Sequence, residues 1–245
     1  MSSTTERIAI VTGGSGGIGR ACALRLAADG IAVVVHYHGN AEQAERTAAS
    51  ITELGGRALT VGGDIAEEET AAALFDTAQR EFGGVDVLVH TAGIMPLSPV
   101  AQLDLEEFDR VQRVNVRGTV VVDQLAAQRI RPGGAIINFS SSITRLQTPT
   151  YGAYAASKAA VEALSLILAR ELRGRDITVN AVAPGPTATP LFLDGKSPEL
   201  VEQIAGGNPF QRLGTPEDIA ETVAFLAGPA RWINGQTLFV NGGAA

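Results

Sequence analysis

The hydrophobic pattern of this chain alternates short apolar runs with longer amphipathic stretches. The runs are rich in β-branched residues, which is typical of strands buried on both faces of a parallel sheet. They lie at residues 8–11, 32–35, 58–62, 85–90, 135–139, 177–183 and, as a closing strand and tail, 238–243. Helical periodicity fills the segments between them, which predicts an α/β fold: one doubly wound, seven-stranded parallel sheet with helices on both faces. No internal boundary or repeat is visible, so we expect a single domain over residues 1–245.

One stretch departs from this alternation. The segment from about residue 189 to 212 is weakly patterned and is interrupted by proline and glycine. A long segment of this kind in a compact domain is typical of a lid over a pocket. We therefore expect a substrate lid there.

The composition narrows the classes of function. The chain has 245 residues, of which 45% are hydrophobic and 18% charged, and its net charge of −7 argues against nucleic acid and membranes as partners. Its one cysteine, Cys22, excludes an internal disulfide and a multi-cysteine metal site, and we expect it to be buried. No apolar run reaches the length of a membrane span, about 18 residues, and no signal-peptide pattern precedes the first strand. We expect a cytoplasmic protein without a bound metal.

A glycine-rich turn follows the first strand. Residues 12–19 read TGGSGGIG and lead directly into a helix that Gly30 ends. Glycines let the backbone approach a pyrophosphate, and a helix N-terminus supplies amide donors and a favourable dipole. A flexible Gly/Ser loop is the plain alternative, but the order strand, turn, helix favours a phosphate cradle.

The stretch from Ser141 to Lys158 carries the candidate acid–base chemistry. Tyr154 and Lys158 are four residues apart and share one helix face, and Ser141 precedes Tyr154 by thirteen residues. A free tyrosine has a pKa of about 10, and we expect the nearby ammonium to lower it. A pair of this kind suits general acid–base catalysis. Taken alone, the YxxxK spacing also fits an exposed tyrosine and a solvated lysine.

Together the two motifs resemble those of the short-chain dehydrogenase/reductase family, TGxxxGxG and YxxxK, including its 3-oxoacyl-reductase-like members. The resemblance spans nearly the whole chain. It implies a Rossmann-type oxidoreductase that interconverts a carbonyl and a secondary alcohol of a small molecule by hydride transfer, and subunits that pair as a homotetramer or homodimer. In the implied catalytic set, Tyr154 exchanges the proton, Ser141 binds the substrate oxygen, Lys158 binds the nicotinamide ribose and Asn115 holds a water near Lys158.

The end of the second strand bears on the choice of dinucleotide. An NAD site usually has an acidic residue here, but this chain has none before Glu42. His36, His38 and Asn40 can instead donate hydrogen bonds to a 2′-phosphate, which predicts NADP(H). The alternative is that the histidines are solvated strand-end residues and that the site also accepts NAD(H).

The resemblance implies further cofactor contacts around the sheet edge. They are Gly13, Ser15, Gly17, Ile18, Gly19, Asp64, Ile65, Ala92, Gly93, Tyr154, Lys158, Pro184, Gly185, Thr187 and Thr189. Where relatives usually read NNAG, this chain has His90 and Thr91 before Ala92 and Gly93. We expect His90 to be a hydrogen-bonded strand-end residue.

The substrate pocket is expected to be partly hydrophobic. Its candidates are Ile94, Met95, Tyr151, Leu191 and Phe192. Two other functions fit the same residues less well: an NAD-dependent alcohol or sugar dehydrogenase, and a non-catalytic cofactor-binding protein, which has no need of the tyrosine.

Overall fold

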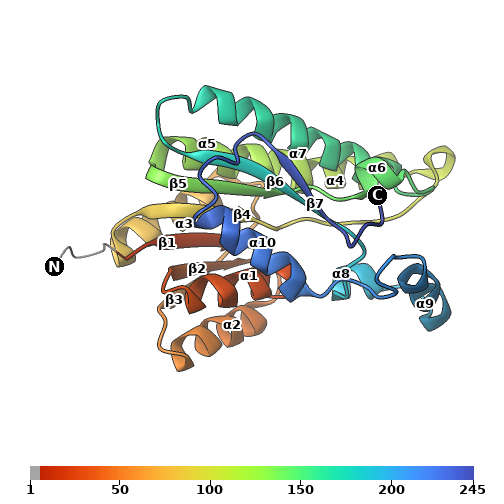
Figure 1. The fold of residues 1–245 in the computed structure, drawn as a ribbon. Coiled ribbons are helices and arrows are strands. Elements are labelled where there is room, and N and C mark those ends of the chain that lie inside the picture. Colours follow the sequence, from red (N-terminus) through yellow and green to blue (C-terminus); the bar gives the residue numbers. More distant parts are fainter. Residues whose placement is uncertain (1–5) are drawn as a thin grey trace.

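The computed structural model describes residues 6–245, and its centre is a parallel sheet of seven strands (Figure 1). The strand order is β3-β2-β1-β4-β5-β6-β7, and each pair of neighbours is parallel. The strands are β1 (Ile8–Thr12), β2 (Ala32–Tyr37), β3 (Ala58–Gly62), β4 (Val85–His90), β5 (Ile130–Phe139), β6 (Thr178–Pro184) and β7 (Thr237–Val240). The order reverses between β1 and β4, the point at which α/β sheets bind ligands. The predicted doubly wound sheet is confirmed.

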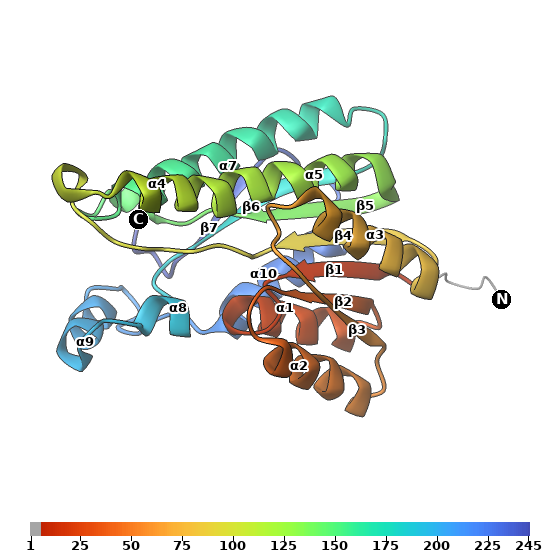
Figure 2. The ribbon, with the colours of Figure 1, turned by 180° about the vertical axis from the view of Figure 1, so that it is seen from behind.

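Helices cover both faces of the sheet, as Figures 1 and 2 show from opposite sides. One face carries α3 (Glu68–Phe82), α5 (Gly118–Arg129) and α7 (Gly152–Glu171). The other carries α1 (Gly17–Ala28), α2 (Ala41–Glu53) and α10 (Pro216–Ala227).

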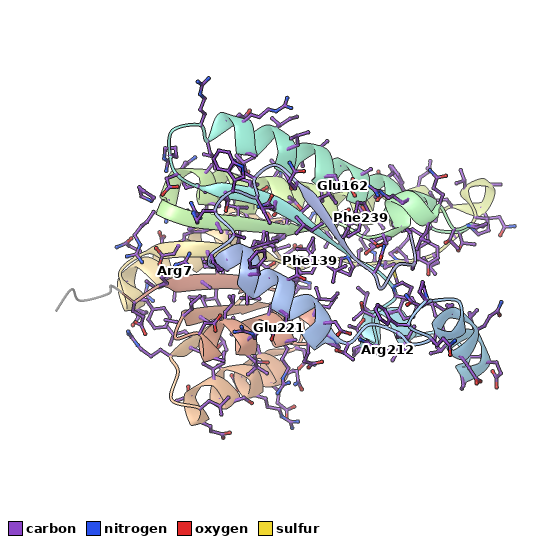
Figure 3. All side chains as sticks on the ribbon, viewed as in Figure 1. Arg7, Phe139, Glu162, Arg212, Glu221 and Phe239 are labelled. Carbon is purple, nitrogen blue, oxygen red and sulfur yellow. The ribbon has the colours of Figure 1, made fainter. Side chains whose placement is uncertain are left out.

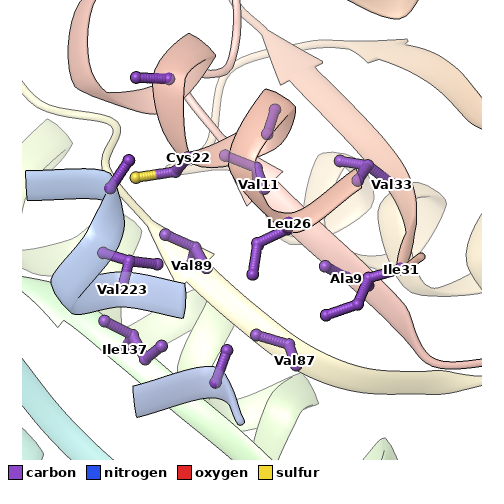
Figure 4. Close-up of a cluster of buried hydrophobic side chains, with 14 of the residues drawn as sticks. Ala9, Val11, Cys22, Leu26, Ile31, Val33, Val87, Val89, Ile137 and Val223 are labelled. Atoms are coloured by element: carbon purple, nitrogen blue, oxygen red, sulfur yellow. The ribbon is translucent and has the colours of Figure 1, made fainter. Parts of the chain in front are cut away.

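Alternating side chains of each strand build the two cores. In β1, Ala9 and Val11 pack toward α1 and α10, and Ile8 and Ile10 pack toward α3 and α5. Figure 4 shows the first of these clusters, with Cys22 among its side chains. Cys22 is fully buried, as predicted, and burial raises the pKa of its thiol far above the usual value.

The predicted long helix at 104–128 is divided in the structure. It consists of α4 (Leu105–Gln112), a π-helical turn at Arg113–Arg117 and α5. Within it, the carbonyl oxygen of Asn115 accepts a hydrogen bond of 2.7 Å from the Thr119 hydroxyl. Such turns often accompany functional sites.

The segment predicted to be a weakly structured lid contains two short helices. These are α8 (Pro190–Leu193) and α9 (Pro198–Gly206), and each begins with a proline after a hydroxyl-bearing N-cap residue. In Figures 1 and 2 they lie with the C-terminus, beyond the carboxyl ends of the strands. The remaining short elements are Val100–Gln102 and α6 (Ile143–Leu146).

Helix α7 is long and apolar enough to pass a simple test for a membrane span, with a mean hydropathy of 1.2. In this structure it packs against the sheet, and its buried residues include Tyr154 and Lys158. A core helix meets the same test, so this is weak support for a span.

Candidate active site

A cleft of about 650 Å³ opens at the carboxyl ends of the strands. It is bordered by the glycine turn, the ends of β4, β5 and β6, the start of α7, and helices α8 and α9. The predicted site residues that line it are Gly13, Ser15, Gly17, Ile18, Gly19, Ala92, Gly93, Met95, Ser141, Tyr151, Tyr154, Lys158, Pro184, Gly185, Thr187, Thr189, Leu191 and Phe192. Residues that lie far apart in the sequence are thus brought together, as the motifs predicted.

The glycine turn has the geometry of a phosphate cradle. Gly13 and Gly17 have φ values of +66° and +51°, a region that favours glycine. A Cβ atom on Gly19 would lie 2.3 Å from the carbonyl oxygen of Gly13, so no side chain fits there. Because Gly17 also begins α1, the N-terminus of that helix lies at the cleft, where a phosphate group is favoured. The residues present therefore fit a dinucleotide pyrophosphate.

His90 and Thr91, which stand where relatives usually have two asparagines, contact the start of the glycine turn. His90 is buried, and its Nδ1 lies 2.8 Å from the Thr12 hydroxyl oxygen, which confirms the predicted hydrogen-bonded strand-end role. Burial lowers the pKa of His90 to about 3, so the ring is neutral. The Thr91 hydroxyl donates to the carbonyl oxygen of Thr12 at 2.5 Å. The pair holds the start of the glycine turn against β4.

Ser141, Tyr154 and Lys158 meet in the cleft. Ser141 lies close enough to Tyr154 to lower the pKa of its phenol, and Lys158 Nζ lies 5.7 Å from the centre of the Tyr154 ring. The Tyr151 ring packs edge-on against Tyr154, with the centroids 6.5 Å apart. Tyr154 is 8% exposed, and Lys158 is 5% exposed.

The predicted lowering of the tyrosine pKa is wrong for this structure. Burial raises the pKa of Tyr154 to about 12, and the nearby Ser141 hydroxyl offsets only part of that rise. Burial also lowers the pKa of Lys158 to about 8, which weakens its hold on a proton. The sequence argument counted the neighbouring charge but not the desolvation of both groups.

Asn115 lies next to this group and ties two elements together. Its Oδ1 accepts from the Ile94 amide at 2.9 Å, and its Nδ2 donates to the Ile94 carbonyl oxygen at 2.9 Å and to the Ser157 hydroxyl at 3.0 Å. The side chain therefore fixes the segment after β4 against α7. Ile94, a predicted pocket residue, contributes its backbone here and is not part of the cleft lining. The water-holding role of Asn115 stays a prediction.

The two histidines expected to bind the adenosine 2′-phosphate of the cofactor differ in their surroundings. The prediction that His36 donates to a phosphate does not fit, because the residue is only 1% exposed. Both ring nitrogens also have partners within the protein. The Gly13 amide donates to Nδ1 at 3.4 Å, and Nε2 donates to the Gly63 carbonyl oxygen at 3.0 Å. Burial lowers the pKa of His36 to about 4. His38 is exposed at the end of β2, with Nδ1 3.3 Å from the same Gly63 oxygen.

Three other predicted cofactor residues also have structural partners. Asn40 is the N-cap of α2 and accepts from the Gln43 amide at 3.0 Å. Asp64 accepts from the Ala66 amide at 2.9 Å and pairs with Arg113 at 2.5 Å, while Ile65 is buried in the core. These bonds fix the turn after β3, and the cofactor contacts of these residues stay predictions.

The loop after β6 uses its threonines internally. Thr187 donates to the Gly185 carbonyl oxygen at 2.9 Å, and Thr189 caps α8. A backbone bond of 2.8 Å from the Ala188 amide to Gly214 joins the loop to the segment before α10. The hydroxyls of both threonines are therefore engaged within the loop.

Comparison with known proteins places these features in a family. A sequence profile described as Enoyl-(Acyl carrier protein) reductase matches residues 13–245. A "Short-chain type dehydrogenase/reductase" of Picea abies is 47% identical over 97% of this chain and 92% of its own length. The chain belongs to the short-chain dehydrogenase/reductase family.

Two further members of the family are similar over nearly the whole chain. The "NADPH-dependent aldehyde reductase-like protein, chloroplastic" of Arabidopsis thaliana is 46% identical over 97% of this chain and 93% of its own length. A crystal structure of a short-chain dehydrogenase from Burkholderia cenocepacia J2315, in complex with NADP, superposes with a TM-score of 0.91 at 40% identity, covering 98% of each chain. The chain is therefore an oxidoreductase of this family.

In this short-chain dehydrogenase/reductase, sequence reasoning missed residues that support the site. Asn241 donates to the Ser142 hydroxyl at 3.1 Å. The Arg145 guanidinium lies 3.8 Å from the centre of the Phe239 ring. Glu162 accepts from the Ser140 hydroxyl at 2.6 Å. Glu162 could have been noticed, because it follows Lys158 by the same four residues that separate Lys158 from Tyr154.

Proposed function

We propose that this protein reduces the carbonyl group of a small molecule to a secondary or primary alcohol with NADPH, and catalyses the reverse reaction with NADP. The observation that carries the proposal is the meeting of Ser141, Tyr154 and Lys158 in one cleft with the glycine turn. A non-catalytic cofactor-binding protein needs the turn but not a hydroxyl pair beside a buried ammonium.

The three side chains have different tasks in the proposed reaction. A bound nicotinamide supplies the hydride for the carbonyl carbon. The Tyr154 hydroxyl donates its proton to the carbonyl oxygen as negative charge develops there. The Ser141 hydroxyl donates a hydrogen bond to the same oxygen, and the Lys158 ammonium holds the nicotinamide ribose and favours the phenolate that remains.

The raised pKa of Tyr154 supports reduction as the favoured direction. A phenol with a pKa of about 12 stays protonated near neutral pH and is a ready proton donor. In the oxidative direction the same phenol has to lose its proton first, which becomes easier as the pH rises. We therefore expect reduction to be faster than oxidation near neutral pH.

We infer NADP(H) as the preferred cofactor. His38 follows the end of β2, no carboxylate comes before Glu42 in the sequence, and the nearby Asp64 is paired with Arg113. The Burkholderia structure named in complex with NADP and the Arabidopsis NADPH-dependent relative support the same choice. Selectivity for NADH over NADPH would contradict it.

For the substrate we propose an uncharged carbonyl compound with an apolar side chain. The cleft beyond Tyr154 is lined by Met95, Ile143, Leu146, Leu191 and Phe192. Arg212, the guanidinium on its wall, is already paired with Asp218 at 2.5 Å. Aldehydes are the first compounds to test, given the name of the Arabidopsis relative. We propose that residues 189–212, with α8 and α9, close over such a substrate within a single catalytic domain.

We also propose that the subunits assemble as a homotetramer, in the cytoplasm. Apolar side chains on the outer surface of α7 and at the start of α4 support an assembly: Leu166 is 40%, Ile167 53% and Leu105 72% exposed. Light scattering after gel filtration tests the assembly, and a monomer would contradict it. Cell fractionation tests the compartment, and recovery with membranes would contradict it.

The experiment that tests the reaction compares wild-type protein with Tyr154→Phe. NADPH oxidation is followed with a panel of aldehydes and ketones, and NADPH binding is measured by calorimetry. We expect the variant to lose about 100-fold to 10,000-fold in kcat, the usual contribution of a general acid, with NADPH affinity nearly unchanged. Tight NADPH binding without turnover by the wild type across the panel would instead support the non-catalytic alternative.

A further inference from the structure

We propose that Glu162 is a positioning residue for this reaction, holding the segment that carries Ser141 on the helix that carries Tyr154 and Lys158. The inference rests on the proposed function. Tyr154, Lys158 and Glu162 recur every four residues, so they follow one side of α7. Figure 3 labels Glu162 on this helix and Phe139 at the end of β5.

One carboxylate oxygen of Glu162 accepts hydrogen bonds from two hydroxyl groups. Its Oε1 accepts from the Ser140 hydroxyl at 2.6 Å and lies 3.0 Å from the Thr144 hydroxyl. Hydrogen bonds to an ionised acceptor are roughly twice as strong as those between neutral groups. Ser140 is only 3% exposed, so water does not readily replace this acceptor.

The two hydroxyls stand on either side of Ser141. Ser140 precedes it directly, and the Thr144 hydroxyl also lies 3.0 Å from the Ser141 carbonyl oxygen, so two acceptors share its one proton. The Ile143 amide, in turn, donates to the Ser141 hydroxyl oxygen at 3.3 Å. Glu162 thus fixes a short turn whose centre is the proposed substrate-binding serine.

Helix α7 holds the same peptide from a second side. Lys158 Nζ donates to the carbonyl oxygen of Phe139 at 2.8 Å, immediately before Ser140. With Lys158 on the carbonyl and Glu162 on the next hydroxyl, the end of β5 is attached to the helix at consecutive positions. The distance between Ser141 and Tyr154 therefore depends on Glu162.

Removing the carboxylate leaves Ser140 with one weaker acceptor, the Lys158 carbonyl oxygen at 3.3 Å. The turn then gains freedom, and Ser141 shifts relative to Tyr154. A displacement of about 1 Å in a positioning group can lower a rate about 100-fold. The loss falls on kcat, because Glu162 is not among the residues that line the cleft.

The test measures kcat and KM for an aldehyde that the wild type reduces, together with NADPH affinity by calorimetry. We expect Glu162→Ala to lower kcat about 10-fold to 100-fold, with KM and NADPH affinity within about twofold. Glu162→Gln keeps an acceptor oxygen and should retain at least about a third of wild-type kcat. Glu171→Ala, the same change at an exposed glutamate at the end of α7, should behave as wild type.

Two further variants show whether Glu162 acts through the serine turn. Ser140→Ala combined with Thr144→Val keeps the carboxylate and removes its donors, and it should reproduce the loss seen in Glu162→Ala. In a Ser141→Ala background, Glu162→Ala should add little, because coupled residues are not additive. An equal loss in both backgrounds would overturn the proposal.

The outcomes separate this proposal from the proposed function. If Glu162→Ala keeps wild-type kcat while Tyr154→Phe and Ser141→Ala are impaired, Glu162 has no positioning role and the reaction assignment stands. If Tyr154→Phe is fully active, the assignment itself fails. If Glu162→Ala does not fold, wild-type kcat in the Ser140→Ala and Thr144→Val double variant still overturns the proposal.

Discussion

Lys158 Nζ donates a hydrogen bond of 2.8 Å to the carbonyl oxygen of Phe139. This bond fastens the first turns of α7 to the end of β5 and holds a buried positive charge 5.7 Å from the centre of the Tyr154 ring. Because burial disfavours the charged form of the side chain, the pKa of Lys158 falls to about 8. The charge on which the proposed chemistry depends is therefore sensitive to pH.

The first prediction concerns the pH dependence of reduction. Because burial lowers the pKa of Lys158, the ammonium is present below pH 8 and is lost as the pH rises through about 8. We expect kcat/KM for aldehyde reduction to fall about tenfold for each pH unit above that value. Lys158→Arg keeps its charge at this pH, so any residual activity should lack this limb. A wild-type profile that stays flat to pH 9.5 would contradict the assignment.

The second prediction separates His36 of β2 from His38, which follows the strand. His38 is exposed, so His38→Asp places a carboxylate where we propose that the 2′-phosphate binds. Two such charges about 4 Å apart repel by about 1–4 kcal/mol. We expect NADPH affinity to fall about tenfold or more, and NADH affinity to rise, as measured by calorimetry.

His36→Asn is the matched comparison for that experiment. The buried His36 ring holds the glycine turn and Gly63, so its loss should weaken the binding of both dinucleotides to a similar degree. An unchanged ratio of the two affinities in His38→Asp would show that His38 does not face the 2′ position.

The third prediction concerns a buried acid in the core, Asp123 of α5. Burial raises its pKa to about 7, although the Asn138 amide donates to Oδ2 at 2.9 Å. Within residues 6–245, Oδ1 of Asp123 and Oδ1 of Asn138 are both buried without a hydrogen-bond partner. In the unfolded chain the carboxyl has its ordinary pKa of about 3.9, so the folded protein holds this proton more tightly.

Stability should therefore fall as the pH rises from about 4 to about 7, the interval between these two pKa values. Asp123→Asn removes the titration and brings an amide donor for the Asn138 oxygen. At about 1.4 kcal/mol per pKa unit, we expect it to raise the free energy of unfolding at pH 8 by about 1–4 kcal/mol. Urea unfolding at pH 5 and pH 8 measures this, with the exposed Asp109→Asn as control. If Asp123→Asn changes the free energy of unfolding equally at both pH values, the raised pKa of Asp123 is refuted.

The fourth prediction compares two glycines of the same turn, Gly16 and Gly19. A Cβ atom on Gly19 would lie 2.3 Å from the Gly13 carbonyl oxygen and 2.6 Å from the Thr91 hydroxyl, whereas one on Gly16 would meet nothing within 4 Å. Gly16 also has extended backbone, with φ −168°. We expect Gly19→Ala to lower the free energy of unfolding by about 1–3 kcal/mol, and Gly16→Ala to leave it nearly unchanged. Chemical denaturation compares them, and similar values would argue against the observed turn geometry.

The sequence predicted the sheet well because buried parallel strands leave a clear signal. The buried strand at 85–90 begins and ends where its apolar run does, and so does the partly buried edge strand at 58–62. The π-helical turn at Arg113–Arg117 was missed, because its hydrogen-bond register depends on contacts of Asn115 with Ile94 and Ser157 that are remote in sequence. The starts of the two lid helices could have been predicted, because Thr189-Pro190 and Ser197-Pro198 each place proline after a hydroxyl-bearing N-cap residue.

The candidate site was predicted by residue type but not by environment. The motifs brought Ser141, Tyr154 and Lys158 together correctly, yet the direction of the tyrosine pKa shift came out opposite, because burial cannot be read from spacing. The same reason explains His36, which the strand pattern placed at an exposed end and the fold buries beneath the glycine turn.

The most direct test of the central claim follows the hydrogen itself. NADPH carrying deuterium at C4 of the nicotinamide, on one face or the other, is incubated with an aldehyde that the protein reduces, and the alcohol is analysed by mass spectrometry. We predict that the deuterium from one face only appears on the carbinol carbon, and that Tyr154→Phe forms little of this product. An alcohol without deuterium from either face would contradict hydride transfer and the account built on it.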